Sequence, residues 1–532
     1  MAETDFPSLY WALERDVESL ENTTLGIETV TPPGPYQLVV AVEAATICSS
    51  DIKVIKLGDQ HPLFSGGAAS DDFKLVLGHE LCLRVVGVGA GLETRFRVGQ
   101  RLGLQPTIRG HGDYSSQTVG MDIHGGFCQY LKLDERIVAG AEPYVFEVPE
   151  DVPAAVLAML EPYACVERAY RPNARTTFAT AGTCLIYCGA GYEDFHLSRE
   201  LHHDSTRCIG GTDDWLARSM PGVTGVERFS SLEGLGGERF DDIVVCGDVT
   251  PHELEALVSA LAKGGVLVHA RKEDSPRLIG LDPARIHYHG LSFFGTSQND
   301  IASALHPARQ RYDVTPGGVA LVHGAGGPMG RIHVHRLLQL ADGPETVVAT
   351  SRSEARRRDL VSDFDALARR SGCSLVVTDG SDIDRIREHY APDGFTDVAV
   401  AAPSAQAVDW AAGQLADDGM LIVFAGMPFG SSASIDLGRI SSANRRITGS
   451  TSCSVDDEKE VLARIVSGEL DPTLNLKAVT GLGSLGRALS TMINGEVSGK
   501  IAVFPQVPDM PLRHVERWTS ADELEQAERW RR

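Results

Sequence analysis

The chain has 532 residues, which is too long for one ordinary hydrophobic core and predicts about two to four domains. Hydrophobic residues make up 43% and charged residues 23%, with 55 glycines, a mixture typical of a globular α/β protein and not of a fibrous or disordered one. The formal net charge of -23 argues against a nucleic-acid partner, because binding a polyanion requires a basic face.

The start of the chain, MAETDFPSLYWALERDVESL, carries acids where a signal peptide has a basic and then an apolar run. No stretch of the sequence is apolar for long enough to span a bilayer. We therefore expect a cytoplasmic protein with a small-molecule substrate and no membrane partner. The ten cysteines lack the even, tight spacing of a disulfide framework, so most are expected to be buried thiols.

The first half of the chain changes pattern once. Residues 36–150 read as short β elements with glycine turns, such as YQLVVAVEAATIC and GGFCQYLKL, which predicts a small β-rich domain. The stretch VPEDVPAAVLAMLEPYACVERAY then has helical apolar spacing. Beyond it, apolar strands alternate with helical segments, the βαβ signature of a parallel doubly wound sheet.

In the first half, one pair of segments favours a metal site. TICSSDIKVI places Cys48 at the end of a predicted strand, and LVLGHELCLRVVG places His79 and Glu80 at the start of another. A thiolate, an imidazole and a carboxylate from separate β elements suit a zinc ion with an open coordination position. Glu161, at the start of the helix in MLEPYACVERAY, adds another acid; the alternative is a first-turn acid favoured by the helix dipole.

The βαβ pattern occurs twice. FDDIVVCGDVTPHELEALVSALAKGGVLVHARK, from Phe240, aligns with FTDVAVAAPSAQAVDWAAGQLADDGMLIVFAGM, from Phe395, as strand, helix, glycine turn and strand. HGLSFFGTS and RRITGSTS follow at about the same separation, which makes Gly295 and Gly449 equivalent. A separation that holds along the whole segment predicts a duplicated nucleotide-binding-type domain, with 299–316 as the link.

The glycine turn of the first copy is incomplete. YCGAGYEDFHLSREL keeps Gly189 and Gly191, but Glu193 and Asp194 occupy the place of a third glycine and a close-packed helix. Two carboxylates at this point repel a phosphate at short range. We therefore expect the first copy to have lost dinucleotide binding.

The turn of the second copy is intact. In VALVHGAGGPMGRIHVHRLL, Gly324, Gly327 and Gly330 follow an apolar strand directly and open a helix. Glycine is required because the turn is tight and the cofactor pyrophosphate must reach backbone N–H groups at a helix N-terminus. The turn, including Pro328 and Met329, is therefore the predicted cofactor-binding segment.

The next strand bears on the choice of cofactor. In ETVVATSRSEARRRDL, Thr350, Ser351 and Arg352 stand where an NAD-selective enzyme usually has an acidic residue. A neutral hydroxyl beside arginines, which include Arg356 and Arg357, suits a 2'-phosphate, so NADP(H) is predicted in preference to NAD(H). The alternative is that these arginines only solvate the start of a helix.

Four motifs in order carry a resemblance to a known family. CSSD, GHE, GGFCQY and LEP, followed by a Rossmann pattern, resemble the medium-chain zinc-dependent alcohol and polyol dehydrogenases over nearly the whole chain except the extra copy. Glutamate in the LEP helix is typical of polyol and sugar dehydrogenases, and GAGGPMG is similar to sorbose 1-phosphate reductase-like members. The resemblance implies an α/β protein with a GroES-like catalytic domain and two Rossmann-type domains, of which the first is degenerate. The implied boundaries are 1–170 for the GroES-like domain, completed by 475–506, then 180–300 for the degenerate domain, 316–474 for the NAD(P)-binding domain and 507–532 for a C-terminal tail.

The resemblance also implies roles at the metal. Cys48, His79 and Glu161 would bind catalytic zinc, and Glu80 would be an exchangeable or neighbouring ligand. The Ser50 hydroxyl would relay a proton outward during catalysis.

Two lysines and one substitution complete the implied site. Lys53 stands where relatives often carry a relay histidine; it would finish the relay, bind an anionic substrate group or be solvated. Lys500 matches a position that contacts the cofactor pyrophosphate. The stretch LGLQPTIRGHGDYSSQTVGMDIHGGF has no cysteine before Cys128, whereas many members carry four that hold a structural zinc, so one zinc is predicted.

Such dehydrogenases commonly dimerise through edge strands of their Rossmann domains. The chain is therefore expected to form a homodimer or an internal pseudo-dimer, in which the degenerate copy takes the partner's place and the strands near Gly295 and Gly449 meet.

The predicted activity is hydride transfer between NADP(H) and a secondary alcohol or ketone of a polyol, sugar, sugar phosphate or cyclitol, with walls of the substrate pocket from the loops 56–73 and 106–120. Two alternatives are a lyase or epimerase that uses the same cofactors without net redox change, and a non-catalytic cofactor-sensing or scaffold protein.

Overall fold

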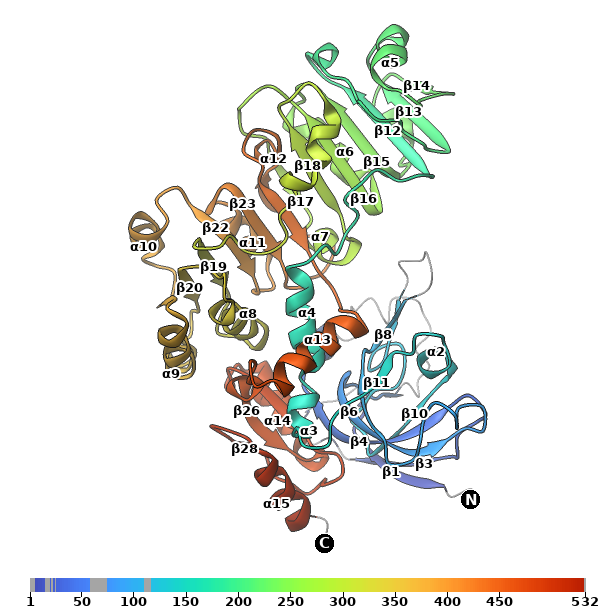
Figure 1. The fold of residues 1–532 in the computed structure, drawn as a ribbon, viewed down its shortest axis with the longest axis vertical. Coiled ribbons are helices and arrows are strands. Elements are labelled where there is room, and N and C mark those ends of the chain that lie inside the picture. The colour runs from blue at the N-terminus through green and yellow to red at the C-terminus, as the bar shows by residue number, and fades with distance from the viewer. Residues whose placement is uncertain are drawn as a thin grey trace. The chain divides into compact units, whose positions relative to one another are not determined.

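The chain forms two compact units (Figure 1). The computed structural model describes residues 5–14, 20, 23, 25–57, 74–109 and 116–530. The first unit comprises Met1–Val166 and Ser452–Arg532, and the second comprises Glu167–Thr451. Much of both expected substrate loops, residues 58–73 and 110–115, lies outside the described residues. Among the helices of the described ranges, none combines the length and apolar character needed to cross a membrane.

The first unit is built on an eight-stranded mixed sheet. Its order is β11-β7-β6-β4-β27-β26-β28, with β10 also paired to β4. The strands are β4 Leu38–Thr46, β6 Glu80–Val88, β7 Arg101–Leu104, β10 Tyr130–Leu133, β11 Val145–Glu147, β26 Leu476–Thr480, β27 Lys500–Val503 and β28 Arg513–His514. Thr46 pairs with Glu80 on one side and with Ala502 on the other. This register brings the end of β4 and the starts of β6 and β27 to one end of the sheet.

Short strand pairs and helices surround this sheet. The pairs are β1 Phe6–Tyr10 with β3 Gly26–Val30, β2 Leu13–Glu14 with β5 Lys74–Leu75, and β8 Thr107–Arg109 with β9 Ser116–Thr118. The helices are α1 Ser49–Leu57, α2 Glu135–Val138, α3 Ala154–Leu157, α4 Leu160–Ala169, α13 Val455–Val466, α14 Leu485–Ile493 and α15 Ser520–Trp530. One apolar core joins the sheet to α14, whose Leu485, Ala488 and Leu489 are fully buried. The β-rich prediction for residues 36–150 is confirmed.

The second unit contains two six-stranded parallel sheets of the same design. Their orders are β14-β13-β12-β15-β16-β18 and β21-β20-β19-β22-β23-β25. In each, the first strand is central, the next two extend to one side and the last three to the other, which is the doubly wound order. The predicted fold class, a GroES-like region plus Rossmann-type parallel sheets, is therefore confirmed.

The bounds of these elements follow the two βαβ stretches predicted from the sequence. The first sheet has β12 Thr183–Cys188, β13 Ser205–Ile209, β14 Glu227–Phe229, β15 Phe240–Cys246, β16 Leu261–Ala270 and β18 Ser292–Thr296, with α5 Asp213–Ser219, α6 Pro251–Ser259 and α7 Pro283–His289. The second has β19 Val319–His323, β20 Thr346–Thr350, β21 Ser374–Thr378, β22 Phe395–Val400, β23 Leu415–Val423 and β25 Arg446–Gly449, with α8 Pro328–Gln339, α9 Glu354–Ser371, α10 Ile383–Tyr390, α11 Ala405–Ala412 and α12 Arg439–Ser442.

The two sheets meet at matching edges. Strands β17 (Leu278–Leu281) and β24 (Ala433–Asp436), one from each half, pair antiparallel. The edge strands β18 and β25 are in contact, and an added Cβ at Gly295 would lie 2.5 Å from α12, while one at Gly449 would lie 2.5 Å from α7. Glycine permits this close approach of strand and helix. A single apolar core includes residues of both sheets, so the two halves fold against each other.

Candidate metal centre and nucleotide site

A thiol, an imidazole and a carboxyl converge at the end of the first unit's sheet. Cys48 follows β4, His79 directly precedes β6, and Glu80 is the first residue of β6. Their ligand atoms all lie within 4.8 Å of one another. The antiparallel pairing of β4 with β6 explains this convergence, because it places the end of one strand beside the start of the other.

Asp51 holds these ligand-bearing segments together. It is fully buried; its Oδ2 accepts from the Cys48 backbone N–H at 2.8 Å, and its Oδ1 accepts from the Gly78 N–H at 3.2 Å. The same Oδ1 lies 3.6 Å from His79 Nδ1, so the other ring nitrogen, Nε2, faces the Ser50 hydroxyl at 3.2 Å. Burial lowers the pKa of His79, but the charges of Cys48 and Asp51 outweigh burial and raise it well above its usual range. These contacts place Asp51 where it orients the imidazole and the Cys48 backbone.

Both oxygens of Glu80 already have partners within this unit. The Lys500 ammonium donates to Oε1 and the Thr46 hydroxyl donates to Oε2, and all three side chains are completely buried. Burial disfavours the charge of Lys500, but Glu80 raises the pKa of Lys500 above its ordinary value. Lys500 is thus an internal counter-ion for Glu80, and its contact with a cofactor pyrophosphate stays a prediction.

Lys53 lies on the same short helix as Ser50, α1, and is half-buried. Burial lowers the pKa of its ammonium, and the nearby Cys48 opposes that change. The side chain is therefore placed near the ligand thiol, which is compatible with the relay and anion-binding roles that the sequence suggested.

Glu161 is near this group but makes its short contacts elsewhere. Its carboxylate groups with the thiols of Cys165 and Cys453 within 4.8 Å, and Cys165 Sγ donates to its Oε1 at 3.1 Å. Burial raises the pKa of Glu161, while the charge of His79 lowers it and that of Glu80 raises it. The structure thus brings Cys48, His79 and Glu80 together, whereas Glu161 makes its short contacts with a second group that contains Cys165 and Cys453.

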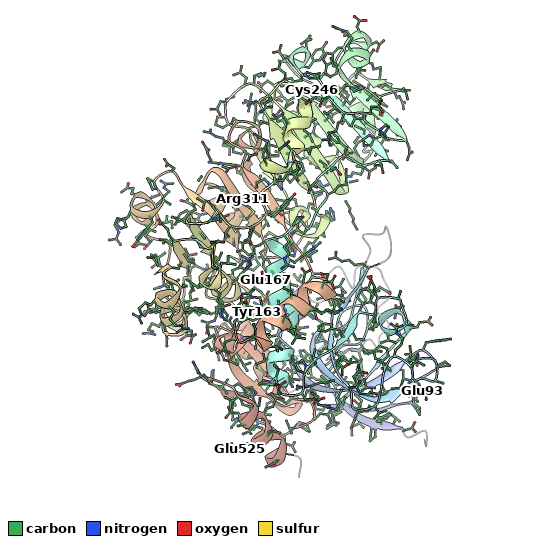
Figure 2. All side chains as sticks on the ribbon, in the orientation of Figure 1. Glu93, Tyr163, Glu167, Cys246, Arg311 and Glu525 are labelled. Carbon is green, nitrogen blue, oxygen red and sulfur yellow. The ribbon has the colours of Figure 1, made fainter. Side chains whose placement is uncertain are left out.

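Sequence reasoning missed this second group. The spacing of four residues between Glu161 and Cys165 on α4 was readable, since such residues share a helix face. Tyr163 of α4, labelled in Figure 2, accepts from Asn475 Nδ2 at 2.5 Å, which ties the helix to the segment before β26. The approach of Cys453, from far along the chain, is a tertiary contact that no local pattern announces.

The intact glycine turn lies between β19 and α8. Gly324 has φ 87°, and an added Cβ there would lie 2.8 Å from the Ala402 nitrogen. A Cβ on Gly330 would collide with the Gly324 carbonyl oxygen. Gly327 is the N-cap of α8, Pro328 is its first residue, and no side chain of the described ranges caps this end. The Arg331 N–H already donates to the Gly327 carbonyl oxygen, so the backbone N–H groups of Met329 and Gly330 are the donors of this turn that an anion could use.

The corresponding turn of the first sheet has a different structure. After β12 and Gly191, with φ 74°, the chain makes a short 3-10 helix at Tyr192–Asp194 and reaches β13 without an α-helix, in a segment that is described throughout. Glu193 and Asp194 are exposed on this turn. The helix N-terminus that would bind a pyrophosphate is absent here.

Ser351 and Arg352 lie where β20 ends. Ser351 is buried against the glycine turn, since a Cβ on Gly326 would collide with its hydroxyl, whereas Arg352 is exposed. Arg357 donates to the carbonyl oxygens of Ser351 at 2.7 Å and Arg352 at 2.9 Å, which fixes the turn. A hydroxyl and a cation thus stand beside the predicted ribose site.

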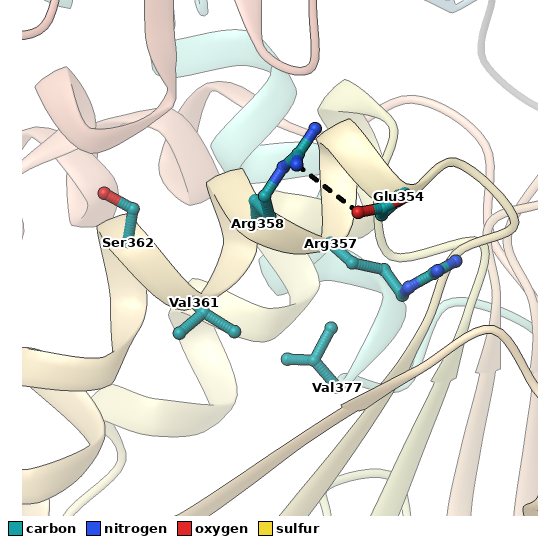
Figure 3. Close-up of a pocket in the computed structure, with 6 residues that line it drawn as sticks. All are labelled: Glu354, Arg357, Arg358, Val361, Ser362 and Val377. Atoms are coloured by element: carbon teal, nitrogen blue, oxygen red, sulfur yellow. Dashed lines mark hydrogen bonds and ion pairs between the residues drawn. The ribbon is translucent and has the colours of Figure 1, made fainter.

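An open pocket of about 390 Å³ lies on the outer side of this region (Figure 3). It is lined by Glu354, Arg357, Arg358, Val361, Ser362 and Val377. These residues belong to α9 and β21, and Arg358 forms an ion pair with Glu354 across one helical turn at 3.3 Å. The pocket adds cationic side chains next to the loop after β20.

Comparisons with known proteins agree with this geometry. Residues 34–143 match the alcohol dehydrogenase GroES-like domain. L-threonine 3-dehydrogenase of Deinococcus radiodurans is 26% identical over 215 residues, a match that covers 37% of this chain and 56% of that protein. NADP-dependent alcohol dehydrogenase 6 of Saccharomyces cerevisiae is 22% identical over 314 residues, covering 52% of this chain and 80% of its own length. The chain therefore spans little more than half the length of the first of these relatives.

Solved structures show the same fold at low identity. A zinc-binding dehydrogenase of Sinorhizobium meliloti, solved with NADP, has a TM-score of 0.51 at 16% identity, with 94% of this chain and all of that chain covered. An alcohol dehydrogenase of Aeropyrum pernix has a TM-score of 0.52 at 16% identity, with 93% and 100% covered.

Proposed function

We propose that this chain, in which residues 34–143 match the alcohol dehydrogenase GroES-like domain, is an oxidoreductase of the medium-chain zinc-dependent type that transfers hydride between NADP(H) and a secondary alcohol or ketone. The substrate class we favour is a polyol, sugar, sugar phosphate or cyclitol. Glutamate in the LEP helix and the GAGGPMG turn support that choice and a sorbose 1-phosphate reductase-like subtype.

The observation that carries the proposal is the convergence of Cys48, His79 and Glu80, with the Ser50 hydroxyl 3.2 Å from His79 Nε2. The donor set fits zinc, which binds thiolate, imidazole and carboxylate. Cys48, His79 and Glu161 would hold the catalytic ion, and Glu80 would be the exchangeable neighbour.

When bound, zinc would favour ionisation of the alcohol, and the nicotinamide would exchange a hydride with the carbon that carries the alcohol oxygen. The side chains of this protein would position the metal ligands and move the proton. Asp51 keeps Cys48 and His79 in place through the contacts of its two oxygens. The Ser50 hydroxyl would accept the proton that leaves the substrate while it gives up its own proton. Lys53, as the neutral amine, would take that proton outward, or as the ammonium it would bind an anionic group of the substrate.

We propose NADP(H) as the preferred cofactor. Gly324, Gly327 and Gly330 would accommodate its pyrophosphate at the start of α8, and Ser351 with Arg352 would face the 2'-phosphate. The absence of a carboxylate at the end of β20 supports this, because a carboxylate there repels that phosphate.

The first sheet would be a structural partner, not a second cofactor site. Its equal strand order and the pairing of β17 with β24 support a duplicated domain arranged as an internal pseudo-dimer. In this proposal 1–170 and 475–506 form the catalytic domain, 180–300 the degenerate copy, 316–474 the cofactor domain and 507–532 a tail. A cytoplasmic location stays a prediction.

The test is a screen of polyols, sugar phosphates and cyclitols that follows NADPH fluorescence with zinc present. Cys48→Ala is expected to lower kcat/KM about a thousandfold or more, because a ligand of the catalytic metal is lost. Cys128→Ala is the control, since Cys128 is also a free thiol of the first unit, more deeply buried than Cys48, and belongs to neither ligand group. Full activity of Cys48→Ala would contradict the proposal. Product formation with no net change in NADPH would favour the lyase or epimerase alternative.

A further inference from the structure

Two thiols and two carboxyls form a buried group beside the candidate metal centre. Ligand atoms of Glu161, Cys165 and Cys453 lie within 4.8 Å of one another, and Cys453 Sγ also lies 3.5 Å from Glu458 Oε1. All four residues are at least nine-tenths buried; the least exposed is Glu458, at 1%. The sequence-based roles use only Glu161 among them.

The backbone holds these side chains in place. Glu161 and Cys165 are one turn apart on α4, so both project from the same face. Cys453 directly precedes α13, which starts with a capping box between Ser454 and Asp457. Glu458 follows in the first turn of that helix. The arrangement therefore does not depend on the four side chains alone.

The backbone of the loop before α13 is strained at Ser452, the residue directly before Cys453. Ser452 has φ 61°, a conformation that a non-glycine residue adopts at a cost. Gln105 Nε2 donates to the Ser452 hydroxyl and to the Cys453 carbonyl oxygen, both at 3.0 Å. Strain maintained by specific contacts is frequent at functional sites.

One atom of the group lacks compensation. Glu458 Oε2 is fully buried and has no hydrogen-bond partner among the residues that the structure describes. Burial raises the pKa of Glu458 well above its usual range, and the charge of Glu161 raises it further. A buried acceptor without a partner loses its hydration and gains no hydrogen bond in return, and a bound cation would remove this cost.

We propose that Cys165, Cys453 and Glu458 bind a second zinc ion, with the Glu161 carboxylate between this ion and the catalytic one. Two thiolates and carboxylate oxygens form a ligand set that zinc prefers over magnesium or calcium. Binding displaces the thiol protons and any proton on Glu458 to solvent, and the ion's two positive charges offset part of the ligand charge.

A disulfide between Cys165 and Cys453 accounts for less of the geometry. Disulfide exchange requires a thiolate with solvent access, whereas both thiols are buried and burial raises the pKa of Cys453 well above its ordinary value. A disulfide would also leave Glu458 Oε2 without a partner. The metal site uses all four side chains.

This site goes beyond the proposed hydride transfer and shares only Glu161 with it. It differs from the cysteine lobe whose absence predicted one zinc, and it raises the expected zinc content to two. The second ion would fix the Glu161 carboxylate, which makes Cys165, Cys453 and Glu458 positioning residues for the catalytic centre.

The experiment measures zinc per chain by mass spectrometry after dialysis of the full-length protein. We expect about two ions in the wild type, and about one in Cys453→Ser, in Glu458→Gln and in Cys48→Ala. Cys128→Ser is the matched control and should keep about two. Glu458→Gln nearly keeps the shape of the side chain, so it tests the site even where a cysteine variant folds poorly.

Cobalt substitution distinguishes this site from the catalytic one. In Cys48→Ala, the remaining cobalt should show thiolate charge-transfer absorption that disappears in Cys48→Ala/Cys453→Ser. One zinc in the wild type, lost in Cys48→Ala and kept in Cys453→Ser, would overturn this inference and leave the proposed function intact. One zinc kept in Cys48→Ala and lost in Cys453→Ser would support the site and overturn the proposed catalytic centre.

Discussion

The two parallel sheets of the second unit are fixed at the base by the same contacts. An arginine ahead of the first strand pairs with an aspartate near the start of the fourth: Arg175 with Asp242 in one sheet, and Arg311, labelled in Figure 2, with Asp397 in the other. In both sheets, the backbone N–H four residues after that arginine donates to the same carboxylate, at 2.7 Å and 3.0 Å. The same ion pair and backbone hydrogen bond therefore fix both sheets, and we call these shared contacts the frame of the sheet.

A second pair of contacts repeats in the same way. Arg285 donates to the Leu261 carbonyl oxygen and Arg445 to that of Leu415, each at 2.6 Å. The turn after the first strand differs: α8 follows β19, whereas a 3-10 helix follows β12. The contacts that fix the strands of such a sheet therefore do not depend on its phosphate-binding turn, since the first sheet keeps these contacts and lacks the turn.

The largest effect is expected from the shared frame. Asp397→Asn and Asp242→Asn each remove a buried carboxylate charge from an arginine that is only partly buried, which costs about 3 kcal/mol, the low end for a buried ion pair. Urea unfolding should show a similar loss for both variants, because both carboxyls are at most 3% exposed. Asp384→Asn, at an exposed ion pair of α10, is the control and should stay within about 0.5 kcal/mol. A loss in only one sheet would refute the equality of the frames.

The next effect concerns the turn that differs. Gly330→Val places a side chain against the Gly324 carbonyl oxygen and should weaken NADPH binding about a hundredfold, or about 2.8 kcal/mol. Asp194→Val, in the corresponding turn of the first sheet, should leave NADPH affinity unchanged. Calorimetric titration measures both, with circular dichroism to check folding. Weaker binding in Asp194→Val would show that the first sheet takes part.

A smaller effect is expected at the end of β20. Ser351→Asp adds a carboxylate at the predicted 2'-phosphate position and should shift the ratio of NADPH to NADH affinity about tenfold toward NADH. Ser362→Asp adds the same charge on the exposed face of α9 and serves as the control. An unchanged ratio in Ser351→Asp would show that the end of β20 does not determine the choice between NADPH and NADH.

The smallest expected effect is a difference between the sheets in how their stability depends on pH. Burial lowers the pKa of His269, on β16, from 6.5 to about 4, whereas β23 carries no histidine. The folded state binds a proton at His269 less readily than the unfolded chain does. The contribution of neutral His269 to the free energy of unfolding is therefore complete above pH 6.5 and is lost as the pH falls toward 4. Between pH 7.5 and 6 the loss should be about 1 kcal/mol. His269→Val should flatten this part of the stability curve; an unchanged slope would assign it to other groups.

The sequence predicted the elements whose signal is local. Strand and helix alternation predicted both doubly wound sheets, and Glu193 with Asp194 in place of glycine indicated the altered turn. Cys48 and His79 were readable because each lies in a short motif at a strand end. Cys453 and Glu458 were not, since their approach to α4 depends on the path of the chain after the second sheet. The pairing of Lys500 with Glu80 was missed for the same reason.

The antiparallel pairing of β17 with β24 has a consequence for concentration. When two separate subunits join through such strands, dilution separates them and exposes two unpaired edges. Here both strands belong to one chain, so the association is intramolecular and its effective concentration does not depend on the amount of protein. The contact therefore persists at any dilution, and each edge remains covered against pairing with other chains.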